Sequence, residues 1–358
     1  MTSIASTSVD HGLRPMAQSA AVDEPSLVCL LPGRANVKYP DGVVLPLRDL
    51  VGGSRIEFWN VAEAPRVERH QHFTLRHSDD WLFGSLELDE DGDLATATEH
   101  AYGLMQAQSH RLGFTHFVRI WNYFGAINAG EGDDERYRHF VAGRARVIAQ
   151  PPAEGYAAAT AIGLPSPPDQ LHIHWLAAKQ PGIAIENPRQ VSAFEYPRDY
   201  GPVAPGFSRA MLVPGESPLL LISGTASIVG HASQHADTIA QLDEILMNLD
   251  ALITAAGARA HARADLARDG LLRVYLRDPA EAGPVRAHLQ RALGSNTCFM
   301  LLHGDVCRDD LRIEIEAAVG TRIAVADDGE DFAGVLVGIV DEEVAVICVV
   351  SVVECGSH

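Results

Sequence analysis

Two carboxylates near the end of the sequence are spaced in a way that suits acid–base chemistry. In the stretch DLRIEIEAAVG, residues 310–320, apolar and polar side chains alternate strictly from Asp310 to Glu316. Such alternation is typical of a half-buried β-strand, because successive side chains point to opposite faces. Glu314 and Glu316 then share one face of the strand. A carboxyl group partly withdrawn from water has a raised pKa and can act as a general acid near neutral pH.

The two carboxylates are not expected to be equivalent. Glu314 becomes a candidate acid if two parts of the chain pack face to face, so that its side of the strand lines a cleft. For Glu316 we predict an ordinary exposed acid that contributes to solubility, because it lies two residues closer to the strand's end.

Arginines offer a way to hold an anion in this acidic chain. The stretch RYRHFVAGRARV places Arg136, Arg138, Arg144 and Arg146 on or near one helix, and Arg209 follows a Tyr/Pro-rich link. Arginine binds carboxylates through two parallel hydrogen bonds. The alternative for the helix is an ordinary solvated basic face.

Metal and nucleotide chemistry are weakly supported. The 16 histidines include pairs such as His172 and His174 in HIHW, but no acidic or cysteine ligand accompanies a pair at a telling spacing. We therefore predict polar or pocket-lining histidines and no metal. The motifs GxGxxG, GxxxxGK[ST], GxSxG and HExxH are missing. Cys307 could be a nucleophile, although a small half-buried side chain is the simpler interpretation.

Composition limits the partners. The chain has 358 residues and a formal net charge of −19. Binding to nucleic acid or to an acidic membrane needs a basic surface, so both are excluded. Five cysteines without a CxxC pair are typical of reduced thiols. We predict a cytoplasmic monomer or small homo-oligomer with a disordered leader over residues 1–26.

The order of the predicted elements repeats along the chain. DQLHIHWLAA aligns with DDLRIEIEAA, which sets His174 where Glu314 stands in the second copy. We predict an α+β fold of two lobes, residues 27–188 and 189–320, each a mixed sheet backed by two helices, with an active-site cleft between the lobes. Residues 321–358 form an extra C-terminal tail, either an added hairpin or an unstructured extension, that we expect to be dispensable for chemistry.

The second half resembles the Rid/YjgF-type fold over roughly 120 residues, through SRAMLV, LISGTASIVG, LLRVYLRD and LRIEIEAAVG. In that family the first Glu of the terminal strand helps to activate water or a proton in a cleft, which implies this role for Glu314. The family's cleft arginine precedes a Cys of the penultimate strand. Here SNTCF places Asn296 near that position, which argues against imine or enamine deamination.

With FVRIWNYFGAIN, ERYRHFVAGRARV and AIENPRQVSAFEYPRDYGP included, residues 27–320 resemble the chorismatase family. The resemblance implies cleavage of chorismate to pyruvate plus a hydroxybenzoate or a cyclohexadiene diol, without metal or organic cofactor. It further implies Glu314 as the acid that protonates the enolpyruvyl methylene, and Arg144 and Arg209 as carboxylate holders. Tyr137, Tyr196 and Tyr200 are implied hydroxyl donors, and His174 lies opposite the acid in the repeat alignment.

Two further positions bear on the product. Cys307 resembles the branch of the family that forms 3-hydroxybenzoate, whereas Ala226, the third residue of GTAS, is associated with the diol-forming branch. We therefore expect 3-hydroxybenzoate, alone or mixed with 4-hydroxybenzoate, and keep hydrolysis to the dihydrodiol acid as the alternative. The competing functions are those of a Rid-type deaminase and of a non-enzymatic protein that binds aromatic acids.

Overall fold

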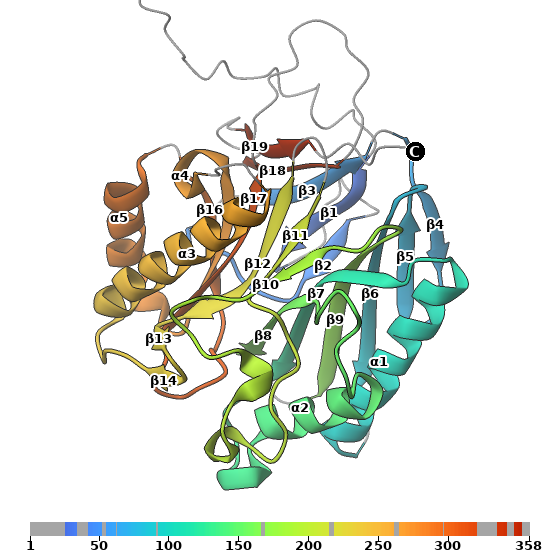
Figure 1. The fold of residues 1–358 in the computed structure, drawn as a ribbon, viewed down its shortest axis with the longest axis horizontal. Helices are drawn as coiled ribbons and strands as arrows, with labels where there is room; N and C mark the ends of the chain where they lie inside the picture. The colour runs from blue at the N-terminus through green and yellow to red at the C-terminus, as the bar shows by residue number, and fades with distance from the viewer. Residues whose placement is uncertain are drawn as a thin grey trace, which may run out of the picture.

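The computed structural model describes residues 26–33, 42–51, 55–61, 63–90, 92–165, 169–214, 218–260, 265–295, 297–320, 335–341 and 347–352. The leader predicted over residues 1–26 lies outside these ranges, except for Ser26, which begins the first strand. Asn296 also lies outside them. Two six-stranded sheets and one five-stranded sheet form the framework (Figure 1).

The first lobe is a six-stranded sheet in the order β4-β5-β6-β9-β7-β8. Its elements are β4 (Arg66–Arg69), β5 (Phe73–His77), β6 (Trp81–Asp89), α1 (Leu94–Arg111), β7 (His116–Gly125), α2 (Arg136–Val147), β8 (Ala158–Leu164) and β9 (Gln170–Ala178). Helix α1 begins at Leu94, where the Asp93 side chain accepts hydrogen bonds from the backbone N–H groups of Ala95 and Thr96.

The second lobe is a six-stranded sheet in the order β10-β11-β12-β17-β15-β16. Its elements are β10 (Ile183–Ile185), β11 (Ala210–Val213), β12 (Leu219–Ala226), the short β13 (Ile228–Val229) and β14 (Ala232–Ser233), α3 (Thr238–Ala260), α4 (Leu266–Asp269), β15 (Gly270–Leu276), α5 (Ala282–Leu293), β16 (Cys298–His303) and β17 (Ile313–Gly320). Helix α3 runs through Gly257 and continues to Ala260.

The two lobes have the same topology. Strand β9 lies between β6 and β7 as β17 lies between β12 and β15, and both central strands are antiparallel to their neighbours. The pairs β7/β8 and β15/β16 are parallel and are joined through α2 and α5. The predicted α+β fold with mixed sheets and a repeated order is therefore confirmed.

A third sheet, in the order β19-β18-β3-β1-β2, joins the two ends of the chain. Strands β1 (Ser26–Pro32), β2 (Val43–Leu45) and β3 (Arg55–Val61) come from the start, and β18 (Val335–Asp341) and β19 (Ile347–Val352) from the end. Strands β18 and β19 form an antiparallel hairpin, and β18 pairs with β3 from Val335 opposite Val61 to Asp341 opposite Arg55. The tail is thus an added hairpin within the described ranges.

Apolar side chains of both lobes meet in a common core. Trp121 of β7, Ile162 of β8, Leu221 of β12 and Tyr275 of β15 are buried together in it, with Leu30 of the third sheet. The opposite face of each six-stranded sheet packs against its own helices, α1 and α2 on the first and α3 and α5 on the second (Figure 1). No helix in the described part of the chain is long and apolar enough to cross a bilayer.

Candidate active site

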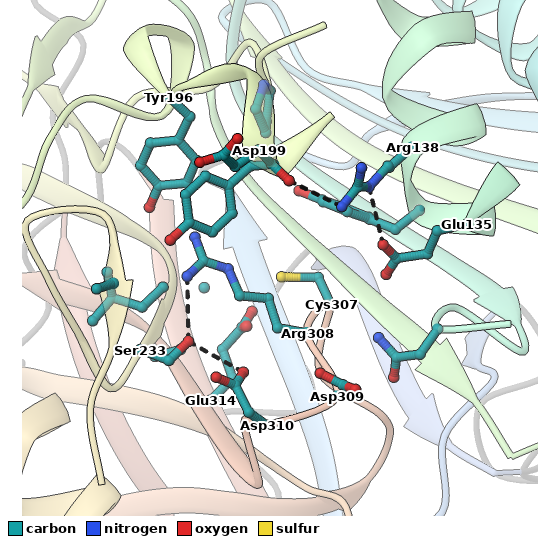
Figure 2. Close-up of a pocket in the computed structure, with 18 of the residues that line it drawn as sticks. Glu135, Arg138, Tyr196, Asp199, Ser233, Cys307, Arg308, Asp309, Asp310 and Glu314 are labelled. Atoms are coloured by element: carbon teal, nitrogen blue, oxygen red, sulfur yellow. Dashed lines mark hydrogen bonds and ion pairs between the residues drawn. The ribbon is translucent and has the colours of Figure 1, made fainter. Parts of the chain in front are cut away.

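A cavity of about 550 Å³ opens where the two lobes meet. Its wall contains the segment after β7, the connection between the lobes, the end of β12 and the loop before β17. Lining residues from these segments include Asn128, Glu135, Tyr137, Arg138, Tyr196, Asp199, Tyr200, Phe207, Arg209, Gly224, Ala226, Ser233, Cys307, Arg308, Asp310 and Glu314. Figure 2 shows Cys307, Arg308 and Glu314 grouped around this cavity, with Tyr196 and Asp199 on its other side.

Glu314 presents a buried carboxyl group to the cavity. It is 5% exposed and lies opposite Ala226 in the ladder between β12 and β17. None of the described residues forms a hydrogen bond or ion pair with this carboxyl within the usual distance limits, which is unusual for a buried acid. Burial, and secondarily the charge of Glu316, raises the pKa of Glu314 to about 8, against smaller opposing effects of Arg119 and Arg209. Glu314 therefore carries its proton at neutral pH.

The carboxyl of Glu314 has room only because residue 224 is glycine. A β-carbon at Gly224 would lie 1.9 Å from Oε1 of Glu314. Gly224 belongs to β12, where the pairing with β17 shifts register between Ile222 and Thr225. This irregularity brings the backbone of β12 against the acid.

The Cys307 thiol stays protonated. Burial, and then the charge of Glu314, raises the pKa of Cys307 to about 12. Because a thiolate is the reactive form of cysteine, this environment disfavours a nucleophilic role. Cys307 instead supplies a small apolar wall beside the acid.

Arg308 is the cation most available to an anion in the cavity. Its guanidinium carbon lies 4.1 Å from the ring centre of Tyr200 and 5.3 Å from that of Tyr196. Nη1 donates to the backbone oxygen of His231 at 2.9 Å and to Oγ of Ser233 at 3.2 Å. Among the described residues no carboxylate pairs with Arg308. The Arg308 guanidinium is therefore not engaged in an ion pair within those ranges.

Arg209 is a second cation, more deeply buried at 4% exposure. Its Nη2 donates to the hydroxyl of Tyr196 at 2.7 Å and to the backbone oxygen of Val191 at 2.9 Å. Its Nε is buried without a partner in the part of the chain that the structure describes. One donor of Arg209 is thus left unsatisfied by the described residues.

The third arginine of the wall is already neutralised. Arg138 forms ion pairs with Glu135 at 3.2 Å and Asp133 at 3.3 Å, and Nη2 donates to the backbone oxygen of Asp199 at 3.1 Å. It ties the loop before α2 to the connection between the lobes (Figure 2).

The structure brings seven of the nine predicted site residues to this cavity, and leaves two outside its wall. Glu314, Cys307, Ala226, Arg209, Tyr137, Tyr196 and Tyr200 line it. Arg144 instead lines a second cavity of about 50 Å³, with its guanidinium over the ring of Tyr102.

His174 is 3% exposed and packs against the rings of Phe83 and Tyr123. Burial lowers the pKa of His174 to about 3, so it is neutral and part of the core rather than of the cavity wall. The apolar surroundings of its strand face explain the difference from Glu314, which stands at the same place in the other lobe.

The prediction for Glu316 is wrong. Its side chain is buried at 4% exposure and accepts hydrogen bonds from Arg119 at 2.6 Å, Trp121 at 2.7 Å and Arg273 at 3.2 Å. Arg273 in turn pairs through two atoms with Glu57 of β3, both at 2.7 Å. The strand continues into the common core of three sheets instead of ending in solvent, and two arginines balance two glutamates there.

Arg308 was missed by sequence reasoning. The sequence predicts Arg144 of the arginine-rich helix and Arg209 after the Tyr/Pro-rich link as the anion-binding residues. Other arginines of that helix are engaged by carboxylates, such as Arg136 by Glu90 and Arg146 by Glu99. The signal that could have revealed Arg308 is its position directly after Cys307, on the short segment leading into the acid-bearing strand.

The site combines a protonated acid, two cations and several hydroxyl groups in a cavity large enough for a small aromatic acid. Within the described ranges, no three His, Cys, Asp or Glu side chains gather in a way that could hold a metal ion. The arrangement suits protonation of a bound anion by Glu314.

Comparison with known proteins gives consistent matches. Residues 57–177 match the family model described as chorismatase FkbO/Hyg5-like, N-terminal. The chain is 33% identical over 271 residues to a 3-hydroxybenzoate synthase of Streptomyces hygroscopicus, covering 72% of this chain and 79% of that protein. It is also 33% identical over 270 residues to a chorismatase of the same organism, covering 74% and 78%. A chorismatase crystal structure aligns with a TM-score of 0.72 and 29% identity, over 84% of this chain and 95% of that one.

Proposed function

The chain belongs to the chorismatase family, and we propose that it converts chorismate to pyruvate and a hydroxybenzoate, with 3-hydroxybenzoate as the main product. The observation that carries the proposal is the buried Glu314 carboxyl, which holds a proton at neutral pH and faces a cavity containing Arg209 and Arg308. Chorismate needs this combination, because it is a dianion whose enol ether is cleaved after protonation of carbon.

The substrate's two carboxylates would be held by Arg308 and Arg209. Arg308 offers an unpaired charge between two tyrosine rings, and Arg209 offers a buried Nε without a partner in the described residues. Charge-assisted hydrogen bonds of this kind contribute about 1.5–3 kcal/mol each. The hydroxyls of Tyr137, Tyr196 and Tyr200 are further donors around the same cavity.

Glu314 would then transfer its proton to the methylene carbon of the enolpyruvyl group. This makes an oxocarbenium ion at the ether carbon, and the ring carbon–oxygen bond breaks as pyruvate leaves with the ether oxygen. The neighbouring ring hydroxyl attacks the vacated ring carbon and returns a proton to Glu314. The resulting arene oxide opens to the hydroxybenzoate, so that the atoms of chorismate are divided between the two products without added water.

The neutral Cys307 thiol beside the acid supports the intramolecular route, because an apolar wall at this point keeps water from the cation. Hydrolysis to the dihydrodiol acid is the alternative, and Ala226 opposite Glu314 is the feature that favours it. A Rid-type deaminase receives no support from the relatives, which are named chorismatase and 3-hydroxybenzoate synthase. We propose a cytoplasmic location for a protein of this kind.

Incubating the purified protein with chorismate tests the proposal. Pyruvate should appear in a one-to-one ratio with an aromatic product that co-elutes with 3-hydroxybenzoate. A dihydrodiol acid in its place would favour the hydrolytic alternative. Saturable binding of aromatic acids without release of pyruvate would show a binding protein, and ammonia released from an added enamine would show a deaminase.

A further inference from the structure

A contact between the two lobes, made by β8 and β12, holds the stretch of backbone that packs against the Glu314 carboxyl. Strand β8 of the first lobe lies against the irregular part of β12, where Ser223 and Gly224 interrupt the regular pairing with β17. The backbone N–H of Gly224 donates to the hydroxyl of Thr160 at 2.9 Å. The backbone N–H of Ala159 donates to the hydroxyl of Ser223 at 2.8 Å.

This contact is connected to both functional groups of the cavity. The Ser223 hydroxyl donates to the backbone oxygen of Ser208 at 2.6 Å, and the Ser223 N–H donates to the backbone oxygen of Arg209 at 2.9 Å. On the other side, Gly224 is in contact with the carboxyl of Glu314, since a β-carbon there would meet Oε1 at 1.9 Å. The position of the β12 backbone therefore sets the places of Arg209 and Glu314 together.

Thr160 also connects this contact between the lobes to the buried ion pair of Arg119 and Glu316. Its hydroxyl accepts a second, short hydrogen bond from Nη2 of Arg119, the same atom that binds Glu316 at 2.6 Å. The hydroxyl thus accepts from two buried donors at once, while the side chain is 3% exposed and does not line the cavity. Its methyl group would lie 3.1 Å from a β-carbon at Gly224.

We propose that Thr160 of the first lobe is a positioning residue for proton transfer in the second lobe, acting through Gly224 on Glu314. The acid itself forms no hydrogen bond with any described residue, so packing against Gly224 must fix its orientation. The Thr160 hydroxyl fixes Gly224 by accepting its N–H. The kinetic effect of Thr160 rests on the proposed reaction, whereas the hydrogen bond between the Gly224 N–H and the Thr160 hydroxyl does not.

The test compares Thr160→Val, Thr160→Ser and Thr98→Val. Valine keeps the shape of threonine but leaves the N–H of Gly224 and one N–H of Arg119 without an acceptor. Serine keeps the hydroxyl. Thr98 is the matched control, because its buried hydroxyl donates to the backbone oxygen of Leu94. Both residues belong to α1, which packs on the face of the first sheet that is turned away from the common core.

For Thr160→Val we expect kcat for pyruvate release to fall by about tenfold or more, with KM changed by less than about threefold, since small displacements of a reacting group are costly. The basic limb of the pH profile should also move to lower pH, because a displaced Gly224 admits water to the acid. Thr160→Ser should retain activity to within about threefold. Equal kcat values in the Thr160→Val and Thr98→Val proteins would overturn the proposal.

Hydrogen–deuterium exchange in peptides covering residues 219–228 separates this inference from the proposed reaction. Exchange there should become faster in Thr160→Val and stay unchanged in Thr98→Val. Unchanged exchange in Thr160→Val would overturn the contact even in an active enzyme. If the unmodified protein released no pyruvate, the proposed function would fail, and the exchange result would still decide whether Thr160 holds Gly224.

Discussion

Glu314 and Glu316 lie two residues apart on one face of β17, yet only Glu314 faces open space. Glu316 is enclosed by Arg119, Trp121 and Arg273, whereas the Glu314 carboxyl packs against Gly224 and forms no hydrogen bond with the described residues. The same strand therefore carries a structural carboxylate and a proton-bearing acid. This division has separate consequences for rate and for stability.

Replacing Glu314 with Gln should abolish most of the turnover. Glutamine keeps the shape of the side chain but cannot protonate carbon, so kcat should fall by about 100-fold or more while binding of 3-hydroxybenzoate changes little. Pyruvate release and calorimetric titration measure the two effects. Glu135→Gln is the control, since Glu135 lines the same cavity but pairs with Arg138. A larger loss in the control would place the acid elsewhere.

The rate should fall at alkaline pH. Burial raises the pKa of Glu314 to about 8, so the carboxyl holds its proton below this pH and loses it above. Because the protonated form is the active one, kcat/KM, which reports the ionisation of the free enzyme, should be constant from pH 6 to 7 and decline as pH rises through about 8. A rate that increased across this range would show that the ionised carboxylate acts as a base.

Replacing Glu316 with Gln should destabilise the fold. It removes one partner of a buried ion pair and leaves Arg119 without its carboxylate, which costs about 3–5 kcal/mol in such cases. Urea unfolding at pH 7 measures the change. Glu68→Gln is the control, because Glu68 pairs with Arg111 at the surface, where such pairs contribute about 1 kcal/mol or less. Equal losses in the two variants would contradict the role assigned to the buried network.

Arg308→Ala should raise KM for chorismate by about 10- to 100-fold, the equivalent of losing one charge-assisted hydrogen-bonding group. Arg308→Lys should restore binding only in part, because the planar guanidinium that makes two parallel hydrogen bonds is lost.

The matching variant Arg144→Ala tests the prediction made from sequence for that residue. Since Arg144 lies beside the small second cavity, we expect it to change KM less than Arg308→Ala does. The reverse order would place a substrate carboxylate at Arg144.

Removing the chain after Gly320 should destabilise the protein. Strand β18 covers the edge of β3, and β3 carries Glu57, which pairs with the buried Arg273. An exposed β3 edge and a loosened Glu57 should lower Tm by about 4 °C or more. Differential scanning calorimetry of the shortened and full chains measures this. Equal Tm values and equal activity would support the expectation from sequence that the tail is dispensable.

Much of the fold could be predicted because its signals are local. Alternation marked the strand that bears Glu314 and Glu316, and the aligned stretches DQLHIHWLAA and DDLRIEIEAA marked the two equivalent central strands. The fate of Glu316 could not be predicted in this way, since its partner Arg119 lies 197 residues away in the chain. Its second partner, Arg273, is itself held by Glu57, which is 216 residues from Arg273. Alternation gives the face on which a side chain lies, but only the packing of the sheets decides whether that face meets water, a cavity or another charge.

The residues that line the cavity could likewise be predicted only where the sequence carries a local pattern. Tyr196, Tyr200 and Arg209 were found because they cluster in the connection between the lobes, which runs along the cavity wall. Arg308 was overlooked because a single arginine in a loop carries no pattern of its own. Its importance comes from the two tyrosine rings that flank it and from the lack of a carboxylate partner among the described residues.

The equivalence of β9 and β17 also bears on how many substrate molecules one chain can process. A duplicated unit begins with two copies of every position, and the central strand of each copy has diverged to a different residue, His174 in one and Glu314 in the other. The histidine is sealed among aromatic rings, so the first copy has become a supporting wall for the reaction centre of the second. For this duplicated architecture we therefore expect an asymmetric catalyst that binds one ligand per polypeptide instead of two.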